Sequence, residues 1–357
     1  MKLLFSYYLP SGGVETLHRI RAENLKRHGI ECHLHYQRMA AGVQNISGIP
    51  TFITNVDEEL YQLLHKERYD AIFVSSDFMM IERMRGWSFH GPLIYEVQGL
   101  GQREQAIQTL TTASPYLKHY CTAALYPQTQ HLSELFQSMF PDLRQFSIAN
   151  FLDTRQFYHR PLERLPYPVI GWVGRIEKNK NWRDFVEIGF QLRQRVPNLK
   201  LWMFEDAHLY EPEEKAAFEQ KIVELGLTPH IIRHSNIPHR KMPELYSMIG
   251  DSGGFLLSTS ILEGFGYAVS EAMSCRCPAL STDSDGVRSF ISHNATGKFY
   301  PIGNIEEAVN QALQLMYDTP LRDHIRNQGA AQIHIHFNPE LYCTRFINLL
   351  RELGLNP

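Results

Sequence analysis

Two glutamates eight residues apart frame a glycine-containing loop in the C-terminal half of the chain. Residues 254–281 begin as an apolar run, pass through Gly264 and Gly266, and then turn helical. Glycine lets the backbone approach a ligand closely, and a helix start offers N–H groups and a partial positive charge to phosphate. The carboxylates of Glu263, at the strand end, and Glu271, expected early in the helix, can each accept several hydrogen bonds from sugar hydroxyls. The segment predicts a ligand site, although glycine-rich strand-to-helix turns also occur throughout doubly wound proteins.

Two cations follow another apolar strand, expected at 169–173. Arg175 comes directly after that strand, and Lys180 lies five residues later. Both can reach a diphosphate from a strand-end loop, Arg as a rigid fork and Lys as a mobile point charge. The alternative interpretation is a solvated basic loop, because residues 175–183 are rich in Lys and Asn.

The elements that must position these residues alternate between strands and helices. Such alternation favours parallel sheets covered by helices, with ligands at the carboxyl ends of the strands. Three prolines within eight residues predict an extended linker, so we expect two doubly wound α/β domains joined near 155–167. The predicted strands are 3–9, 30–36, 71–75, 92–97, 169–173, 199–204, 231–233, 254–259 and 278–281, and the predicted helices are 14–28, 182–196, 213–225, 242–249, 267–274 and 339–353.

Length and composition set the outer limits. A chain of 357 residues suggests two domains, and a net charge of −3 argues against nucleic-acid binding. Five scattered cysteines indicate a reducing compartment, hence a cytoplasmic location. No apolar stretch reaches the roughly 18–20 residues of a membrane helix.

Several short patterns of metal-binding residue types also occur. These are Cys275 with Cys277, and the pairs His33/His35 and His334/His336, which alternate on possible strands. Each supplies only two ligands, and no second pair completes a zinc site. We interpret all of them as structural and expect no metal site.

The segment Glu263-Gly-Phe-Gly-Tyr-Ala-Val-Ser-Glu271 resembles the Glu-x7-Glu signature of the retaining GT-B glycosyltransferases of family GT4. The resemblance continues through Ala272-Met273 to Pro278. It also covers segments along nearly the whole chain, in the family's order: Gly12-Gly13-Val14-Glu15, Asn150-Phe151-Leu152-Asp153 with Phe157, Gly174-Arg175-Ile176 with Lys180, and Pro243-Glu244-Leu245-Tyr246. The resemblance implies two Rossmann-like domains facing a central cleft: 1–160 on the acceptor side, 168–335 for the nucleotide sugar, and a helix in 336–357 that could bridge back to the first domain.

The resemblance further implies a hexosyltransferase that moves a sugar from a nucleoside diphosphate to a hydroxyl acceptor, as in polysaccharide biosynthesis, with retention of anomeric configuration. It assigns catalytic roles to Glu263, Arg175 and Lys180, the two cations neutralising the departing diphosphate. It assigns donor binding to Gly12, Gly13, Gln98, Phe265, Gly266, Tyr267 and Glu271, the last of these on the ribose. The family is typically metal-independent, so we expect neither a metal nor a cofactor.

This chain departs from the family pattern at three places. Gln98 stands where the family often has a donor-contacting His, and an amide can hydrogen-bond a sugar but cannot titrate near neutrality. The sequence Phe204-Glu205-Asp206 replaces a glycine-rich turn at the expected nucleotide base pocket. Ser289 replaces a common Glu. These differences concern the identity of the donor more than the class of reaction.

Three other functions share parts of this pattern. A nicotinamide dehydrogenase needs Gly-x-Gly-x-x-Gly after the first strand, which is absent here. A sugar-nucleotide epimerase of the same fold would act without an acceptor, and a catalytically silent sugar-binding subunit would tolerate Gln98.

The acceptor, either a glycan, a lipid-linked carrier or a small molecule, is not readable from the sequence. The predicted helix 14–28 carries a cluster of basic residues: His18, Arg19, Arg21, Lys26, Arg27 and His28. This cluster could contact an anionic membrane or a lipid-linked acceptor peripherally, but a solvated helix face is the simpler interpretation.

Overall fold

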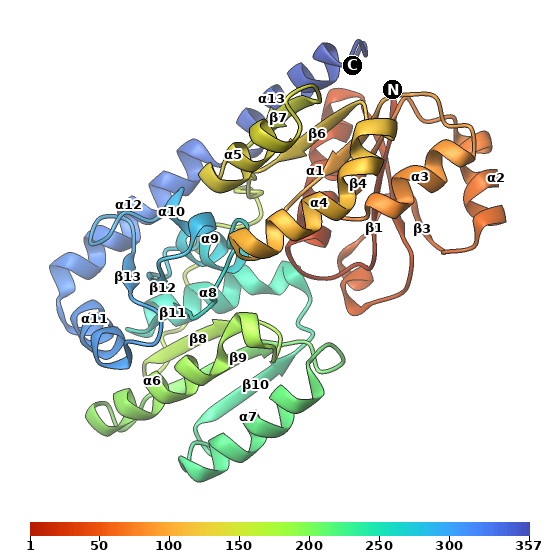
Figure 1. Cartoon of the computed structure of the whole chain (residues 1–357). Coiled ribbons are helices and arrows are strands. Elements are labelled where there is room, and N and C mark those ends of the chain that lie inside the picture. Colours follow the sequence, from red (N-terminus) through yellow and green to blue (C-terminus); the bar gives the residue numbers. More distant parts are fainter. The chain divides into compact units, whose positions relative to one another are not determined.

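The computed structural model describes residues 1–357 and divides them into two compact units, each with its own parallel β-sheet. Unit 1 comprises Met1–Phe151 and Pro339–Pro357, and unit 2 comprises Leu152–Asn338. The chain therefore enters unit 2 once and returns to unit 1 with its last helix, as the colours of Figure 1 trace. The two sheets confirm the predicted α/β class with two doubly wound domains.

Unit 1 contains seven parallel strands in the order β3-β2-β1-β4-β5-β6-β7. The order reverses between β1 and β4, which is the doubly wound pattern. The strands are β1 (Lys2–Tyr7), β2 (Glu31–Tyr36), β3 (Thr51–Ile53), β4 (Ala71–Ser75), β5 (Leu93–Glu96), β6 (Ala123–Tyr126) and β7 (Arg144–Ser147). The helices are α1 (Gly12–Leu25), α2 (Asp57–Glu67), α3 (Phe78–Gly86), α4 (Arg103–Tyr120), α5 (Gln130–Met139) and α13 (Pro339–Glu352), with short 3₁₀ turns η1 (Lys26–His28) and η2 (Ala41–Asn45).

Unit 2 repeats this plan with six parallel strands in the order β10-β9-β8-β11-β12-β13. Its order reverses between β8 and β11. The strands are β8 (Val169–Val173), β9 (Lys200–Glu205), β10 (Ile231–Ser235), β11 (Phe255–Ser258), β12 (Ala279–Thr282) and β13 (Lys298–Tyr300). The helices are α6 (Trp182–Arg195), α7 (Pro212–Glu224), α8 (Met242–Asp251), α9 (Tyr267–Ser274), α10 (Asp285–Arg288), α11 (Ile305–Tyr317) and α12 (Thr319–His336), with 3₁₀ turns η3 (Lys178–Lys180) and η4 (His239–Lys241).

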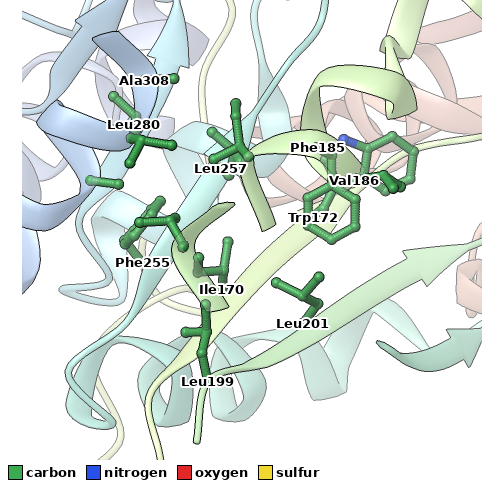
Figure 2. Packing of buried hydrophobic residues seen from close by; sticks show 14 of the residues in the cluster. Ile170, Trp172, Phe185, Val186, Leu199, Leu201, Phe255, Leu257, Leu280 and Ala308 are labelled. Carbon is green, nitrogen blue, oxygen red and sulfur yellow. The ribbon is translucent and has the colours of Figure 1, made fainter. Parts of the chain in front are cut away.

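The largest apolar cluster of unit 2 lies against one face of its sheet. Ile170, Leu201 and Leu257 from neighbouring strands are fully buried there and meet Trp172 and Phe185, whose rings lie 5.6 Å apart (Figure 2). Parallel strands that are buried on both faces have nearly continuous apolar sequences, which is why these strands could be predicted from the sequence. This packing holds the carboxyl ends of β8 and β11 in place.

The proline-rich segment does not link the two units. The Arg160 backbone N–H donates to Ser247 Oγ (3.0 Å), and the Phe157 carbonyl accepts from Ser274 Oγ (2.6 Å). These bonds fix the segment to α8 and α9, so unit 2 begins before the linker expected at 155–167. The predicted first domain, 1–160, was therefore drawn too long.

The two His-x-His pairs differ in structure. His33 and His35 alternate on β2 as predicted, and both rings have hydrogen-bond partners. His334 and His336 lie in helix α12, so the strand expected there was wrong. Asp318 caps that helix by accepting from the Leu321 N–H (3.1 Å), which favours helix over strand. In the whole chain, no three His, Cys, Asp or Glu side chains gather as metal ligands would.

Helix α1 buries the basic residues that the sequence placed on its surface. His18, Arg19 and Arg21 are each 2% exposed or less, so they form neither a solvated face nor a membrane contact. The exposed basic residues of this region are those of η1. None of the helices combines the length and apolar character that a membrane span requires.

Arg21 is held in the centre of unit 1 by a buried carboxylate. Its two terminal nitrogens donate to Glu96 on β5 (2.9 and 2.5 Å), and its Nε donates to Tyr342 on α13 (2.8 Å). Burial alone would raise the pKa of Glu96, but Arg21 lowers it, so the carboxylate is charged. Ser75 Oγ also donates to Glu96 (3.2 Å) and contacts His18 Nε2 (2.9 Å). The bond from Arg21 to Tyr342 thus joins the first helix of the chain to its last, and the pair with Glu96 ties both to β5.

We expect Arg21→Met to destabilise unit 1 by roughly 3–5 kcal/mol, because it leaves a buried carboxylate without its cation. The double variant Arg21→Met with Glu96→Leu should recover much of this loss, since apolar replacement of a whole buried pair is often neutral. Hydrogen exchange of the β1 and β5 amides under increasing urea measures the effect. A loss below about 1 kcal/mol in the single variant would contradict it.

His18 makes unit 1 sensitive to acid. Burial lowers the pKa of His18 to about 3, although neighbouring Glu96 opposes the shift. Below about pH 6.5 the unfolded chain takes up a proton that the folded chain refuses, so stability falls by up to about 1.4 kcal/mol per pH unit between pH 6.5 and pH 3. In His18→Asn this part of the slope should disappear. Unfolding in urea at pH 7, 6, 5 and 4 tests it; equal slopes in both proteins would refute the assignment.

Candidate functional site

The candidate site lies where two neighbouring strands of unit 2 end. Strands β8 and β11 pair in parallel, with Phe255 opposite Ile170, at the point where the strand order reverses. In open α/β sheets, ligands bind outside the carboxyl ends of the strands at this point, because the helices that follow the two strands leave on opposite faces. Arg175 and Lys180 follow β8, and Glu263 follows β11.

Asn179 joins the two loops. Its carbonyl accepts from the Ile261 N–H (2.8 Å), and its side-chain amide makes two bonds to the Leu262 backbone (3.1 and 3.2 Å). Beside it, Thr259 Oγ1 donates to the Lys180 carbonyl (2.7 Å). Thr259, Ile261 and Leu262, which follow β11, are thus fixed to residues 179–180, which follow β8.

This junction brings the predicted residues Lys180 and Glu263 together. Lys180 Nζ donates to Glu263 Oε1 at 2.6 Å, and the two side chains remain 21% and 16% exposed. The ammonium group has three donors and the carboxylate about four acceptor positions, so the pair leaves most of the hydrogen-bonding capacity of both groups available. A partly exposed ion pair of this kind can exchange partners with a ligand at small cost.

Arg175 lies on the same loop as Lys180, next to the end of β8. Its side chain is 44% exposed and pairs with Glu177 (Nε to Oε2, 3.2 Å). A half-exposed guanidinium with a single neighbouring carboxylate keeps free donors. The structure therefore places both predicted cations on one loop, and Lys180 of that loop contacts Glu263.

The glycine loop after Glu263 is held by an aromatic cluster. Phe265 is buried, with ring centroids 5.0 Å from Tyr267, 5.4 Å from Phe290 and 5.8 Å from Phe337. Its side chain thus anchors the loop, which leaves only the backbone of Phe265 for a ligand. Gly266 precedes α9 with φ +81°, a conformation that other residues adopt only with strain.

Glu271 lies deeper in helix α9 than the sequence suggested. It is the fifth residue of Tyr267–Ser274 and is only 5% exposed. Its Oε1 pairs with His239 Nε2 (2.7 Å), and its Oε2 accepts from Tyr246 Oη (3.0 Å). Burial, reinforced by this carboxylate, raises the pKa of Tyr246 well above its ordinary value, so the phenol stays a donor.

Sequence reasoning missed His239 as a site residue. The one feature of the sequence that could have pointed to a site at His239 is its position a few residues after the strand that begins at Ile231. A lone His in a turn predicts no specific function. Tyr246 was noticed as part of a motif, but its bond to Glu271 depends on how α8 packs against α9.

The remaining predicted residues belong to unit 1. Gly12 and Gly13 are the exposed first residues of α1, which begins five residues after the end of β1, and Gly12 has φ +67°. Gln98 follows β5, and both ends of its amide are bonded: Nε2 donates to Glu96 Oε1 (2.8 Å), and Oε1 accepts from Asn150 Nδ2 (2.6 Å). All three lie in segments that follow the carboxyl ends of strands in the sheet of unit 1.

The segment at the expected nucleotide base pocket, residues 204–206, has bulky side chains in place of the family's glycine-rich turn. Phe204, at the end of β9, stacks on His234 of β10 with centroids 4.9 Å apart, and Glu205 pairs with Arg233 (2.5 Å). The edge of the unit 2 sheet formed by β9 and β10 is therefore aromatic and charged.

Two doubly wound units of this kind form a GT-B fold, and comparison with known proteins agrees. Residues 154–332 match the family model for glycosyl transferases group 1. Because the match covers half of the chain, the protein belongs to that family.

Curated relatives are distant. Trehalose synthase from Pyrococcus horikoshii is 23% identical over 189 residues, which cover 52% of this chain and 44% of that enzyme. N-acetyl-alpha-D-glucosaminyl L-malate synthase from Bacillus anthracis is 22% identical over 237 residues, which cover 62% of this chain and 58% of that enzyme. The chain thus spans about half the length of the curated relatives it matches.

Solved structures match over the full length. Anabaena HepE, solved in complex with UDP-glucose, has a TM-score of 0.83 at 19% identity, covering 99% of this chain and 100% of that one. Sucrose-phosphate synthase from Thermosynechococcus elongatus has a TM-score of 0.80 at 16% identity, covering 99% of each chain. At these identities the likeness concerns the fold.

We expect Gly266→Ala to disturb the site more than an ordinary glycine replacement. An added Cβ would lie 2.7 Å from Val287 Cγ1 and would also strain a φ of +81°. Gly303→Ala is the matched control, because its φ is +76° but its Cβ would meet nothing within 4 Å. The control should lose about 1 kcal/mol of unfolding free energy and Gly266→Ala about 1–3 kcal/mol more. Urea denaturation measures both; equal losses would show that the contact with Val287 is unimportant.

Proposed function

We propose that this protein is a retaining, metal-independent hexosyltransferase of the GT4 class, which transfers a sugar from a nucleoside diphosphate to a hydroxyl of a glycan, a lipid-linked carrier or a small molecule. The observation that carries the proposal is the 2.6 Å pair of Lys180 and Glu263 at the strand-order reversal of unit 2. It puts a cation for phosphate and an acid for sugar hydroxyls at adjacent positions. Membership of the glycosyltransferase family supports it, and HepE, of the same fold, was solved with UDP-glucose.

The chemistry explains the cations. When the bond between the anomeric carbon and the diphosphate oxygen breaks, negative charge builds on the leaving group. Fixed donors stabilise that charge more than they stabilise the ground state. In the proposal Lys180 moves from Glu263 to the diphosphate, and Arg175 binds a second oxygen through its fork. The two side chains take the place of a metal ion.

Glu263 then contacts the donor sugar near its reacting carbon, and the backbone of Phe265, Gly266 and Tyr267 holds sugar or phosphate. Glu271 binds the ribose. The acceptor oxygen forms its new bond on the face from which the diphosphate leaves, and its proton passes to the departing phosphate oxygen. This course retains the anomeric configuration and requires no nucleophile from the protein. Gly12, Gly13 and Gln98 complete the proposed donor contacts.

The first experiment identifies the donor. UDP, GDP and ADP sugars are screened by thermal shift, because a ligand that binds only the folded state raises the melting temperature. Product analysis with and without acceptors follows. A sugar transferred to a hydroxyl supports the proposal, an isomerised nucleotide sugar identifies an epimerase, and binding without any product identifies a silent subunit.

We expect Lys180→Ala and Glu263→Ala to lower turnover by about 10²-fold or more, since each removes a group that acts on the transition state. Their unfolding free energies should change by less than about 1 kcal/mol, because the pair is partly exposed. Lys178→Ala, an exposed lysine of the same loop, is the control and should keep wild-type turnover. Wild-type turnover in Lys180→Ala, with the identified donor and acceptor, would refute the assignment.

A further inference from the structure

A buried carboxylate in unit 2 is held by two side chains from other elements. Glu271 of α9 is bonded by His239 of η4 and by Tyr246 of α8, one partner on each carboxylate oxygen. The sequence separations are 32 and 25 residues, so the contacts are products of the tertiary fold. Neither partner is a cation of the Lys or Arg type that would neutralise the carboxylate permanently.

The two hydrogen bonds occupy only half of the acceptor positions of the Glu271 carboxylate. An ionised carboxylate has about four acceptor positions, two on each oxygen. The imidazole takes one position on Oε1 and the phenol takes one on Oε2, so one position on each oxygen remains. Two donors on a single ligand, spaced as the two oxygens are, would fill both. A vicinal diol has that arrangement.

The imidazole is itself fixed. The ring of His239 lies against the ring of Phe157, with centroids 4.9 Å apart. Phe157 is fully buried, and its carbonyl accepts from Ser274 Oγ (2.6 Å), on the same helix as Glu271. Glu271 is itself part of helix α9, and His239 packs against Phe157, which is bonded to the same helix. Both partners of the His239–Glu271 bond are therefore fixed relative to α9.

We propose that His239 is a positioning residue for the nucleotide: it orients the Glu271 carboxylate so that the two remaining acceptor positions bind the 2′- and 3′-hydroxyls of a ribose. The inference rests on the proposed function, which places a nucleoside diphosphate in this site. Without the imidazole, the Oε1 end of the carboxylate loses its fixed direction and must be ordered when the ligand binds. The loss falls on binding of the diol and on nothing else in the nucleotide.

The test uses nucleotides with and without the diol. Calorimetry first measures the affinity of the wild-type protein for UDP, ADP and GDP and for their 2′,3′-dideoxy counterparts. The ribonucleotide that the wild type binds, together with its dideoxy counterpart, is then used with every variant. We expect His239→Ala to weaken the ribonucleotide about tenfold, as the loss of one well-placed hydrogen bond does. The dideoxy nucleotide should change less than twofold. His239→Gln, whose Nε2 can replace the ring nitrogen, should restore most of the affinity.

Two further variants complete the design. Tyr246→Phe removes the other donor to the same carboxylate and should give the same preferential loss for the ribonucleotide. It also keeps the test available if His239→Ala does not fold. His324→Ala is the matched control, an exposed histidine on α12 of the same unit, and should bind both nucleotides as wild type does. In turnover, His239→Ala should raise the donor KM and leave kcat within about threefold, the signature of lost uniform binding.

Equal weakening of the ribonucleotide and the dideoxy nucleotide in His239→Ala would overturn the inference, because it would show a general disturbance of the site. Unchanged affinity in His239→Ala alongside a loss in Glu271→Gln would also overturn it, while leaving the proposed function intact. Wild-type protein that binds none of the three diphosphates and transfers no sugar would instead overturn the proposed function, and this inference with it.

Discussion

The hydrogen bonds between Asn179 and the backbone of residues 261–262 decide where the charged groups of the candidate site stand. They tie the loop that follows β8 to the loop that follows β11. Strand pairing alone brings the two strand ends near each other, but it does not set the path of the chain beyond them. With the loops joined, Lys180 meets Glu263, and the glycine turn that begins α9 starts from a fixed point.

The site residues that the sequence predicted, apart from Glu271, share one property: each lies in a segment that follows a buried strand or at the start of a helix. Lys180 and Glu263 could be found because apolar runs are easy to locate and because parallel strands end at one edge of a sheet. His239 could not be found this way. Its contact with Glu271 depends on how the turn after β10 packs against α9, which no local pattern encodes.

The fold class was predicted correctly, and the errors within it have the same cause. The central strands of unit 2 and most of those of unit 1 were recognised, while β3, β6, β7 and β13 were missed. Of these, β3 and β13 are edge strands of three residues, and such short segments carry little periodicity. The basic face of α1 was misread because Arg21 finds its carboxylate 75 residues away, on β5. Charge in a helix predicts exposure only when no distant partner compensates it.

The acids of the site differ in how firmly their partners hold them, and this difference follows from burial. Glu263 shares a partly exposed pair with Lys180, and solvent weakens their attraction, so in the proposed function a diphosphate draws the cation away and frees the acid. Glu271 is nearly enclosed, and loss of either partner there would leave a buried polar group unpaired, at a cost of about 1–3 kcal/mol. The exposed pair is therefore suited to exchanging partners as charge moves during a reaction, whereas the enclosed carboxylate is suited to recognising a part of the ligand that does not react.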